Sequence, residues 1–84
     1  MVFLALTPGG LLEALALAGT TSPVWCCASA ISEAEFSANP SPNLTRFAYT
    51  IVGGVASPEM IGALSTIEEH HPNERIWVEC TSAA

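Results

Sequence analysis

The sequence has no lysine and no aspartate, and its basic side chains, apart from two histidines, are Arg46 and Arg75. Its eight acidic residues are all glutamates, so the formal net charge is -6. Binding of nucleic acid needs a stripe of basic side chains that displaces counterions from the phosphates. Two arginines cannot form such a stripe, and we therefore exclude DNA and RNA as direct ligands.

Charged residues of either sign are scarce, at 12% of the 84 residues, whereas half of the chain is hydrophobic. Globular proteins usually carry about 25% charged residues. A surface with so few charges favours association, so we expect a homo-oligomer or a protein partner. The length fits one domain near the lower limit for independent folding, with residues 80–84 as a loose tail.

Long hydrophobic runs are also missing. The first apolar run, residues 2–6, has no positive charge before it and is too short for a signal peptide. No segment approaches the roughly 18 apolar residues that span a bilayer. The three cysteines are odd in number and lack the spacing of a disulfide framework. These absences predict a cytoplasmic protein without membrane association.

The hydrophobic pattern that is present alternates between strand and helix. Apolar or alternating runs predict strands at residues 2–6, 24–28, 45–52 and 74–80. Helical spacing predicts helices at residues 8–18, 33–38 and 58–71. This order favours a small α/β fold with a four-stranded, mostly parallel sheet, Rossmann-like or flavodoxin-like. The alternative is a ferredoxin-like α+β sandwich, which would arise if residues 32–43 form only a loop.

Each predicted helix begins with a hydroxyl residue that can cap it, namely Thr7, Ser32 or Ser57. Ser32 and Glu35 also have the spacing of a capping box, which supports the short helix. Two stripes at helical spacing predict the buried faces of the longer helices, and their members are Leu11, Leu12, Leu15 and Ala18 in the first and Met60, Ile61, Leu64 and Ile67 in the other.

The carboxyl ends of parallel strands form the rim at which open α/β sheets bind ligands. Helix N-termini at this rim present unpaired amides that suit a small anion. The predicted ligand rim consists of Thr7, Gly9, Gly10, Ser32, Gly53, Gly54 and Ser57. Neither the dinucleotide-binding glycine pattern nor a P-loop is present. We therefore hold a small-anion or nucleotide-binding module as an alternative function.

No group of residues predicts a metal site, a cofactor or a catalytic centre. Glu68 and His71 are three apart near the end of a helix, but two ligands do not make a metal site. Cys26 and Cys27 are neighbours on a predicted strand, so their side chains point to opposite faces. We expect buried, unreactive cysteines and a protein that is not an enzyme.

The last predicted strand carries the candidate interface. Arg75, Trp77 and Glu79 alternate along one face of a strand whose pattern is typical of a sheet edge. A tryptophan on a charge-poor surface is a common interface anchor, and an edge strand can pair with another chain. Self-association or binding of a protein partner is thus the leading hypothesis. A third hypothesis, suggested by the net charge, is an acidic accessory or inhibitor protein.

Overall fold

The computed structural model describes residues 1–38, 41–51 and 57–79 of the chain. The elements follow in the order β1 (Val2–Ala5), α1 (Pro8–Ala18), β2 (Val24–Cys26), α2 (Glu33–Ala38), β3 (Leu44–Arg46), α3 (Pro58–His70) and β4 (Ile76–Val78). The predicted alternation of strand and helix, including the short second helix, is confirmed.

The four strands form one sheet in the order β3-β2-β1-β4, and all three pairings are parallel. This is the α/β fold that the pattern predicts. A ferredoxin-like sandwich would need antiparallel neighbours and is excluded. The strand order is that of the first four strands in the doubly wound Rossmann arrangement. Consequently β1 is central, and β3 and β4 are the edges of the sheet.

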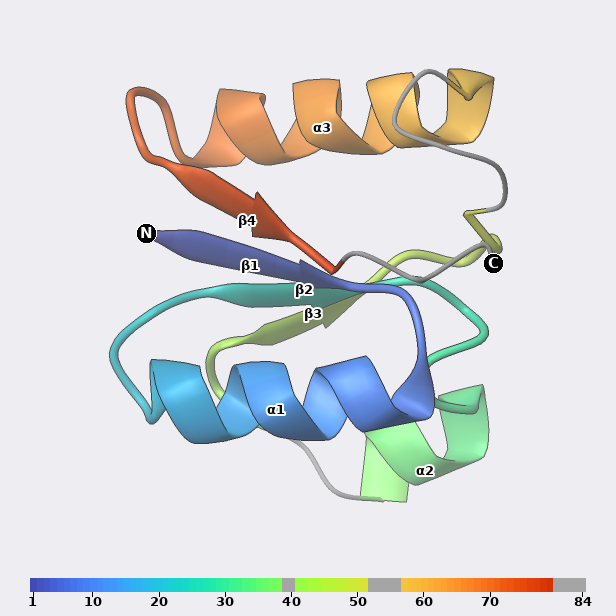
Figure 1. Ribbon diagram of the computed structural model, residues 1–84. Helices are drawn as coiled ribbons and strands as arrows, with labels where there is room; N and C mark the ends of the chain where they lie inside the picture. The colour runs from blue at the N-terminus through green and yellow to red at the C-terminus, as the bar shows by residue number, and fades with distance from the viewer. Residues whose placement is uncertain (39–40, 52–56, 80–84) are drawn as a thin grey trace.

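The sheet is the middle of three layers. Figure 1 shows α3 over one face of the sheet and α1 and α2 over the other, with the strand arrowheads and the helix N-termini on the same side. The core under α3 is formed by Val2, Leu4, Leu6, Trp25, Cys27, Phe47, Ile51, Met60, Ala63 and Ile67. The core under α1 and α2 is formed by Ala5, Leu11, Ala14, Ala18, Val24, Cys26, Ala30 and Leu44.

The predicted caps are present at the start of each helix. The hydroxyls of Thr7, Ser32 and Ser57 accept the amide of the residue three positions later, at 3.0, 3.1 and 3.2 Å. Gly19 ends α1 with a φ of 60°, and its amide donates to the Leu15 carbonyl. Only glycine adopts this conformation without strain, which explains the stop at this residue.

The predicted buried faces of α1 and α3 need correction at two positions. Leu12 and Ile61 are exposed, whereas Ala14 and Ala63 are buried against the sheet. Each exposed residue follows a buried one and lies about 100° further round the helix, outside the buried stripe. Small alanine side chains allow the helix backbone to approach the sheet, and this packing decides which face is inside.

The third strand is shorter than residues 45–52. It ends at Arg46 because β2, its neighbour among the described residues, ends at Cys26 and the chain then turns, with the Ala30 amide donating to the Cys27 carbonyl. Beyond the strand, the Phe47 amide still donates to the Cys26 carbonyl at 2.8 Å. Phe47 and Ile51 are buried as the alternating pattern predicts, but Tyr49 is 40% exposed.

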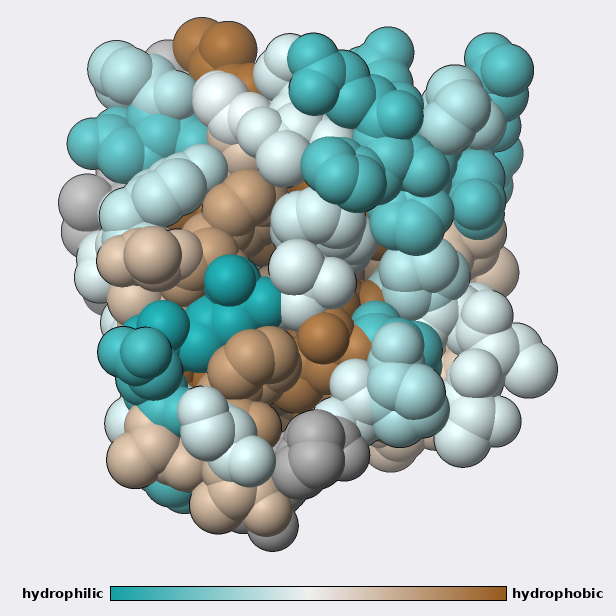
Figure 2. Space-filling view, turned by 180° about the vertical axis from the view of Figure 1, so that it is seen from behind, coloured by the Kyte–Doolittle hydropathy of each residue, from teal (hydrophilic) through white to brown (hydrophobic). Residues whose placement is uncertain are grey.

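Large apolar side chains remain on the surface, namely those of Met1, Leu12, Leu17, Tyr49, Ile61 and Trp77. On the side of the molecule seen in Figure 2, apolar surface reaches the exterior between hydrophilic side chains. This agrees with the low charge content of the sequence. Within the described ranges, no helix has the length and hydrophobicity needed to cross a membrane.

Candidate functional site

The candidate site lies where the strand order changes direction. The chain proceeds from β1 outward to β2 and β3, and then returns to place β4 on the opposite side of β1. In open α/β sheets the crevice at such a switch point, outside the carboxyl ends of the strands, is the usual ligand site. Here it lies between Thr7, Gly9 and Gly10, which follow β1, and Glu79, which follows β4.

The Glu79 carboxylate is the hydrogen-bond acceptor for the backbone amides at this crevice. It accepts hydrogen bonds from the Leu6 amide at 2.6 Å, from the Thr7 amide at 2.9 Å and from the Thr7 hydroxyl. The Thr7 hydroxyl in turn accepts the Gly10 amide and so caps α1. Glu79 therefore supplies, from within the chain, the negative charge that a helix N-terminus favours.

Two properties of Glu79 follow from this position. Partial burial raises its pKa, but the hydrogen bonds from the Thr7 side chain and from the Leu6 and Thr7 amides outweigh the burial, so the pKa lies below its ordinary value. Its carboxylate also fills the space beside Gly10, where a Cβ atom would overlap it, while a Cβ at Gly9 would meet no atom within 4 Å. Glycine at position 10 therefore leaves room for the Glu79 carboxylate.

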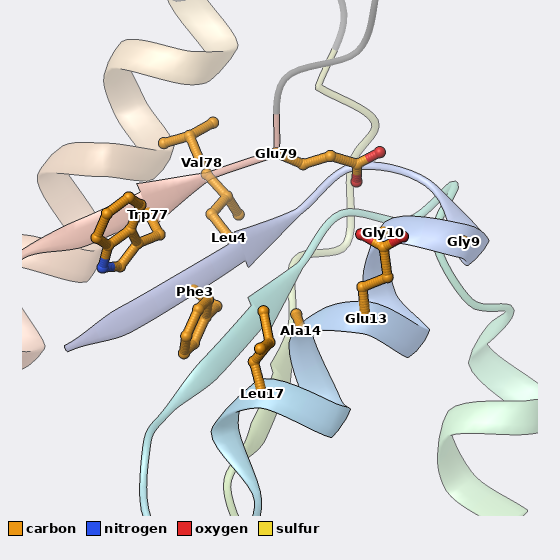
Figure 3. Close-up of a pocket in the computed structure, with 10 residues that line it drawn as sticks. All are labelled: Phe3, Leu4, Gly9, Gly10, Glu13, Ala14, Leu17, Trp77, Val78 and Glu79. Carbon is orange, nitrogen blue, oxygen red and sulfur yellow. The ribbon is translucent and has the colours of Figure 1, made fainter.

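From this crevice an open groove runs between α1 and β4. It has a volume of ≈ 490 Å³. Figure 3 shows the apolar side chains in one part of the groove, namely Phe3, Ala14, Leu17 and Trp77. The glutamates Glu13 and Glu79 lie in the other part, near Gly10. We call these four apolar residues and two glutamates the Trp77 groove. No basic side chain lines it, so its walls suit apolar and cationic groups better than anions.

The described members of the predicted ligand rim lie at the helix N-termini, at the end of the sheet where the strands end. Thr7, Gly9 and Gly10 lie at the crevice beside Glu79, whereas Ser32 and Ser57 cap their own helices. Gly53 and Gly54 lie outside the described residues. An anion that bound at Thr7 would have to replace the Glu79 carboxylate, and anion binding at the rim stays a prediction.

The three predicted interface residues share the face of β4 that α1 leaves open. Trp77 is aligned with Phe3 of β1 and is 49% exposed. The Arg75 guanidinium lies 6.0 Å from the centre of the Trp77 ring. The role of Glu79 at the start of α1 was not foreseen, because 72 residues separate it from Thr7 and the order of strands cannot be read from their patterns.

The cysteines within the described residues are free and buried, in agreement with the prediction. Cys26 and Cys27 belong to the two different cores. Burial, followed by the neighbouring Cys27, raises the pKa of Cys26 to about 11, although Arg46 acts in the opposite direction. The Cys27 thiol donates to the Leu6 carbonyl. A thiol held in this way is a packing residue and a poor nucleophile.

The histidines at the end of α3 lie beside the Trp25 ring, with His70 exposed and His71 half-buried. The rings of His70 and His71 lie 5.4 and 6.0 Å from the Trp25 ring, centre to centre. His70 Nδ1 lies 2.9 Å from the Thr66 carbonyl oxygen, and His71 lies 4.0 Å from the Glu74 carboxylate. Across the part of the chain that the structure describes, no three histidine, cysteine or acidic side chains are grouped to hold a metal ion.

Comparison with known proteins gives no further assignment. No protein-family model matches the chain, and neither curated proteins nor solved structures show significant similarity to it.

Proposed function

We propose that this protein acts without catalysis, by associating with a second copy of itself through the edge of β4 and the Trp77 groove. The observation that carries the proposal is Trp77 itself, a half-exposed tryptophan on an edge strand beside an open apolar groove. Tryptophan buries a large apolar area at interfaces, and such residues often dominate the binding energy.

The surroundings of Trp77 support this role. Leu17, on α1, is 76% exposed at the other wall of the groove. Phe3 is only partly buried between the two. Covering these side chains removes apolar area from water, which contributes roughly 25 cal/mol for each Å² buried. Charged residues make up only 12% of the chain.

Two matched variants on α1 test the proposal. Leu17 and Leu12 are 76% and 72% exposed, but only Leu17 lines the groove. Leu17→Glu is expected to weaken self-association at least about tenfold, since it places a charge in an interface that buries apolar groups. Leu12→Glu adds the same charge and is expected to associate as the wild type does. Sedimentation equilibrium of the three proteins decides the matter, and equal effects of both variants would refute the role of the groove.

The other hypotheses have weaker support. The anion-binding alternative requires displacement of Glu79, and a panel of anions that leaves the melting temperature unchanged would exclude it. The acidic-inhibitor alternative requires a dense patch of glutamates, but α1, α2 and α3 each carry some of them. A cytoplasmic location agrees with free, buried Cys26 and Cys27. Oxidation of these thiols in the purified native protein would count against a reducing compartment.

A further inference from the structure

We infer that the two copies pair their β4 strands antiparallel, with a two-fold axis that passes between Trp77 of one copy and Trp77 of the other. This inference rests on the proposed self-association and specifies its geometry. It joins the two four-stranded sheets into one continuous sheet of eight strands.

The backbone of β4 has one side bonded and one side open. The Arg75 carbonyl accepts the Val2 amide at 2.8 Å, and the Glu79 amide donates to the Leu4 carbonyl at 2.9 Å. Odd-numbered residues thus direct their peptide groups toward β1. Since alternate residues of a strand direct these groups to opposite sides, Ile76 and Val78 direct theirs to the side where the described residues provide no strand.

Antiparallel pairing centred on Trp77 satisfies these open groups. It places Ile76 opposite Val78 of the second copy, and Val78 opposite Ile76 of the second copy. Each of these two pairs exchanges two backbone hydrogen bonds, so the pairing satisfies both amides and both carbonyls of each copy. Trp77 then faces Trp77 of the second copy in the closely spaced type of pair, where aromatic side chains interact well.

The charges on the strand are complementary in this register. Arg75 lies opposite Glu79 of the second copy, on the same face as the tryptophans, and opposite charges in such positions stabilise a strand pair. Glu13 and Glu79 are the charged residues of the groove, so an arginine from the second copy provides the missing cation. Shifting one strand by two residues, the smallest shift that keeps the same groups bonded, would place Trp77 opposite Arg75 or Glu79 instead. The local pairing thereby opposes the repulsion between two chains of net charge -6.

The space beside β4 accommodates both tryptophans. Helix α1 packs chiefly over β1 and β2, and so leaves β4 uncovered on this face, as Figure 3 shows for Trp77. With strands about 4.8 Å apart, the α1 helices of the two copies would be roughly 20 Å apart. Helices in direct contact are separated by about 8–10 Å. The intervening gap is filled by Trp77 and Leu17 from each copy.

Amide hydrogen exchange of the wild-type protein tests this geometry. The amides of Ile76 and Val78 are expected to exchange about tenfold more slowly, or slower still, at concentrations where the dimer dominates than in the dilute monomer. The Glu79 amide already donates to Leu4 within one copy, so it serves as the internal reference for the general stabilisation that association brings.

The outcomes separate the two proposals. If Leu17→Glu abolishes association but concentration leaves the Ile76 and Val78 exchange rates unchanged, the groove is the interface and the strand pairing is wrong. If the wild-type chain stays monomeric at all concentrations, both the proposed function and this pairing are overturned. Concentration-dependent protection of Ile76 and Val78 that exceeds any change at Glu79 supports the pairing.

Discussion

At the scale of single residues, Glu79 connects the two ends of the chain. Its carboxylate holds the Leu6 and Thr7 amides and the Thr7 hydroxyl, and thereby fixes the junction between β1 and α1 against the end of β4. A switch-point crevice usually receives a ligand. In this protein the Glu79 carboxylate lies at the crevice, and the open groove lies beside it.

Replacement of Glu79 by glutamine is expected to lower the free energy of unfolding by about 1 kcal/mol. Hydrogen bonds to charged groups contribute about 1.5–3 kcal/mol, and partial exposure of this carboxylate reduces that figure. Urea unfolding at one fixed protein concentration measures the change, since association adds to apparent stability. The exposed Glu69→Gln is the control and is expected to stay within about 0.5 kcal/mol of the wild type.

The difference in stability between the wild type and Glu79→Gln is expected to depend on pH. Because folding lowers the pKa of Glu79, its ionised form is favoured in the native state. Its contribution is fully present above the ordinary carboxyl pKa of 4.5 and is lost as the pH falls through the lowered value in the folded protein. The stability difference between wild type and Glu79→Gln should therefore shrink at acidic pH. A difference that stays constant down to the acid transition would contradict this role.

At the scale of elements, the start of α1 is docked onto the end of β4 through Gly10. Gly10→Ala is expected to destabilise the protein by about 1 kcal/mol, because the new methyl group displaces the Glu79 carboxylate from its donors. In a Glu79→Ala background the same substitution should become neutral or stabilising, since alanine is the better helix former by up to about 1 kcal/mol.

Gly9→Ala provides the matched control for this double-mutant cycle. A Cβ at Gly9 meets no atom within 4 Å, so its effect should be the same with or without Glu79. Chemical denaturation of the single and double variants yields the coupling energy, which we expect to be about 0.5–3 kcal/mol for Gly10 and near zero for Gly9. Equal coupling at both glycines would show that the carboxylate does not dock the helix.

The elements themselves were largely predictable from the sequence, because caps and hydrophobic spacing are local signals. Thr7, Ser32 and Ser57 begin the three helices, and Gly19 ends α1. The buried faces of α1 and α3 were harder to predict, because several apolar residues on each helix could have been buried. Packing on the sheet buries Ala14 and leaves Leu12 exposed. The contact between Thr7 and Glu79 depends on strand order, a property of the whole fold that no local pattern carries.

At the scale of the whole molecule, the helices cover the sheet incompletely. The two faces of the sheet are covered by helices, but β4 and the Trp77 groove remain open on the side of α1. A net charge of -6 opposes contact between copies at long range, although salt screens it beyond about 8 Å at physiological ionic strength. The proposed association therefore relies on short-range burial of Trp77 and Leu17.

The most direct measurement is light scattering coupled to size-exclusion chromatography, over a range of protein concentrations. The account predicts that the wild type reaches twice the 8.7 kDa mass of one chain. Trp77→Glu is expected to remain at the mass of one chain, because a charge replaces the central contact. A wild type that is monomeric throughout, or a Trp77→Glu variant that associates as the wild type does, would contradict the assignment of β4 and its groove as the association surface.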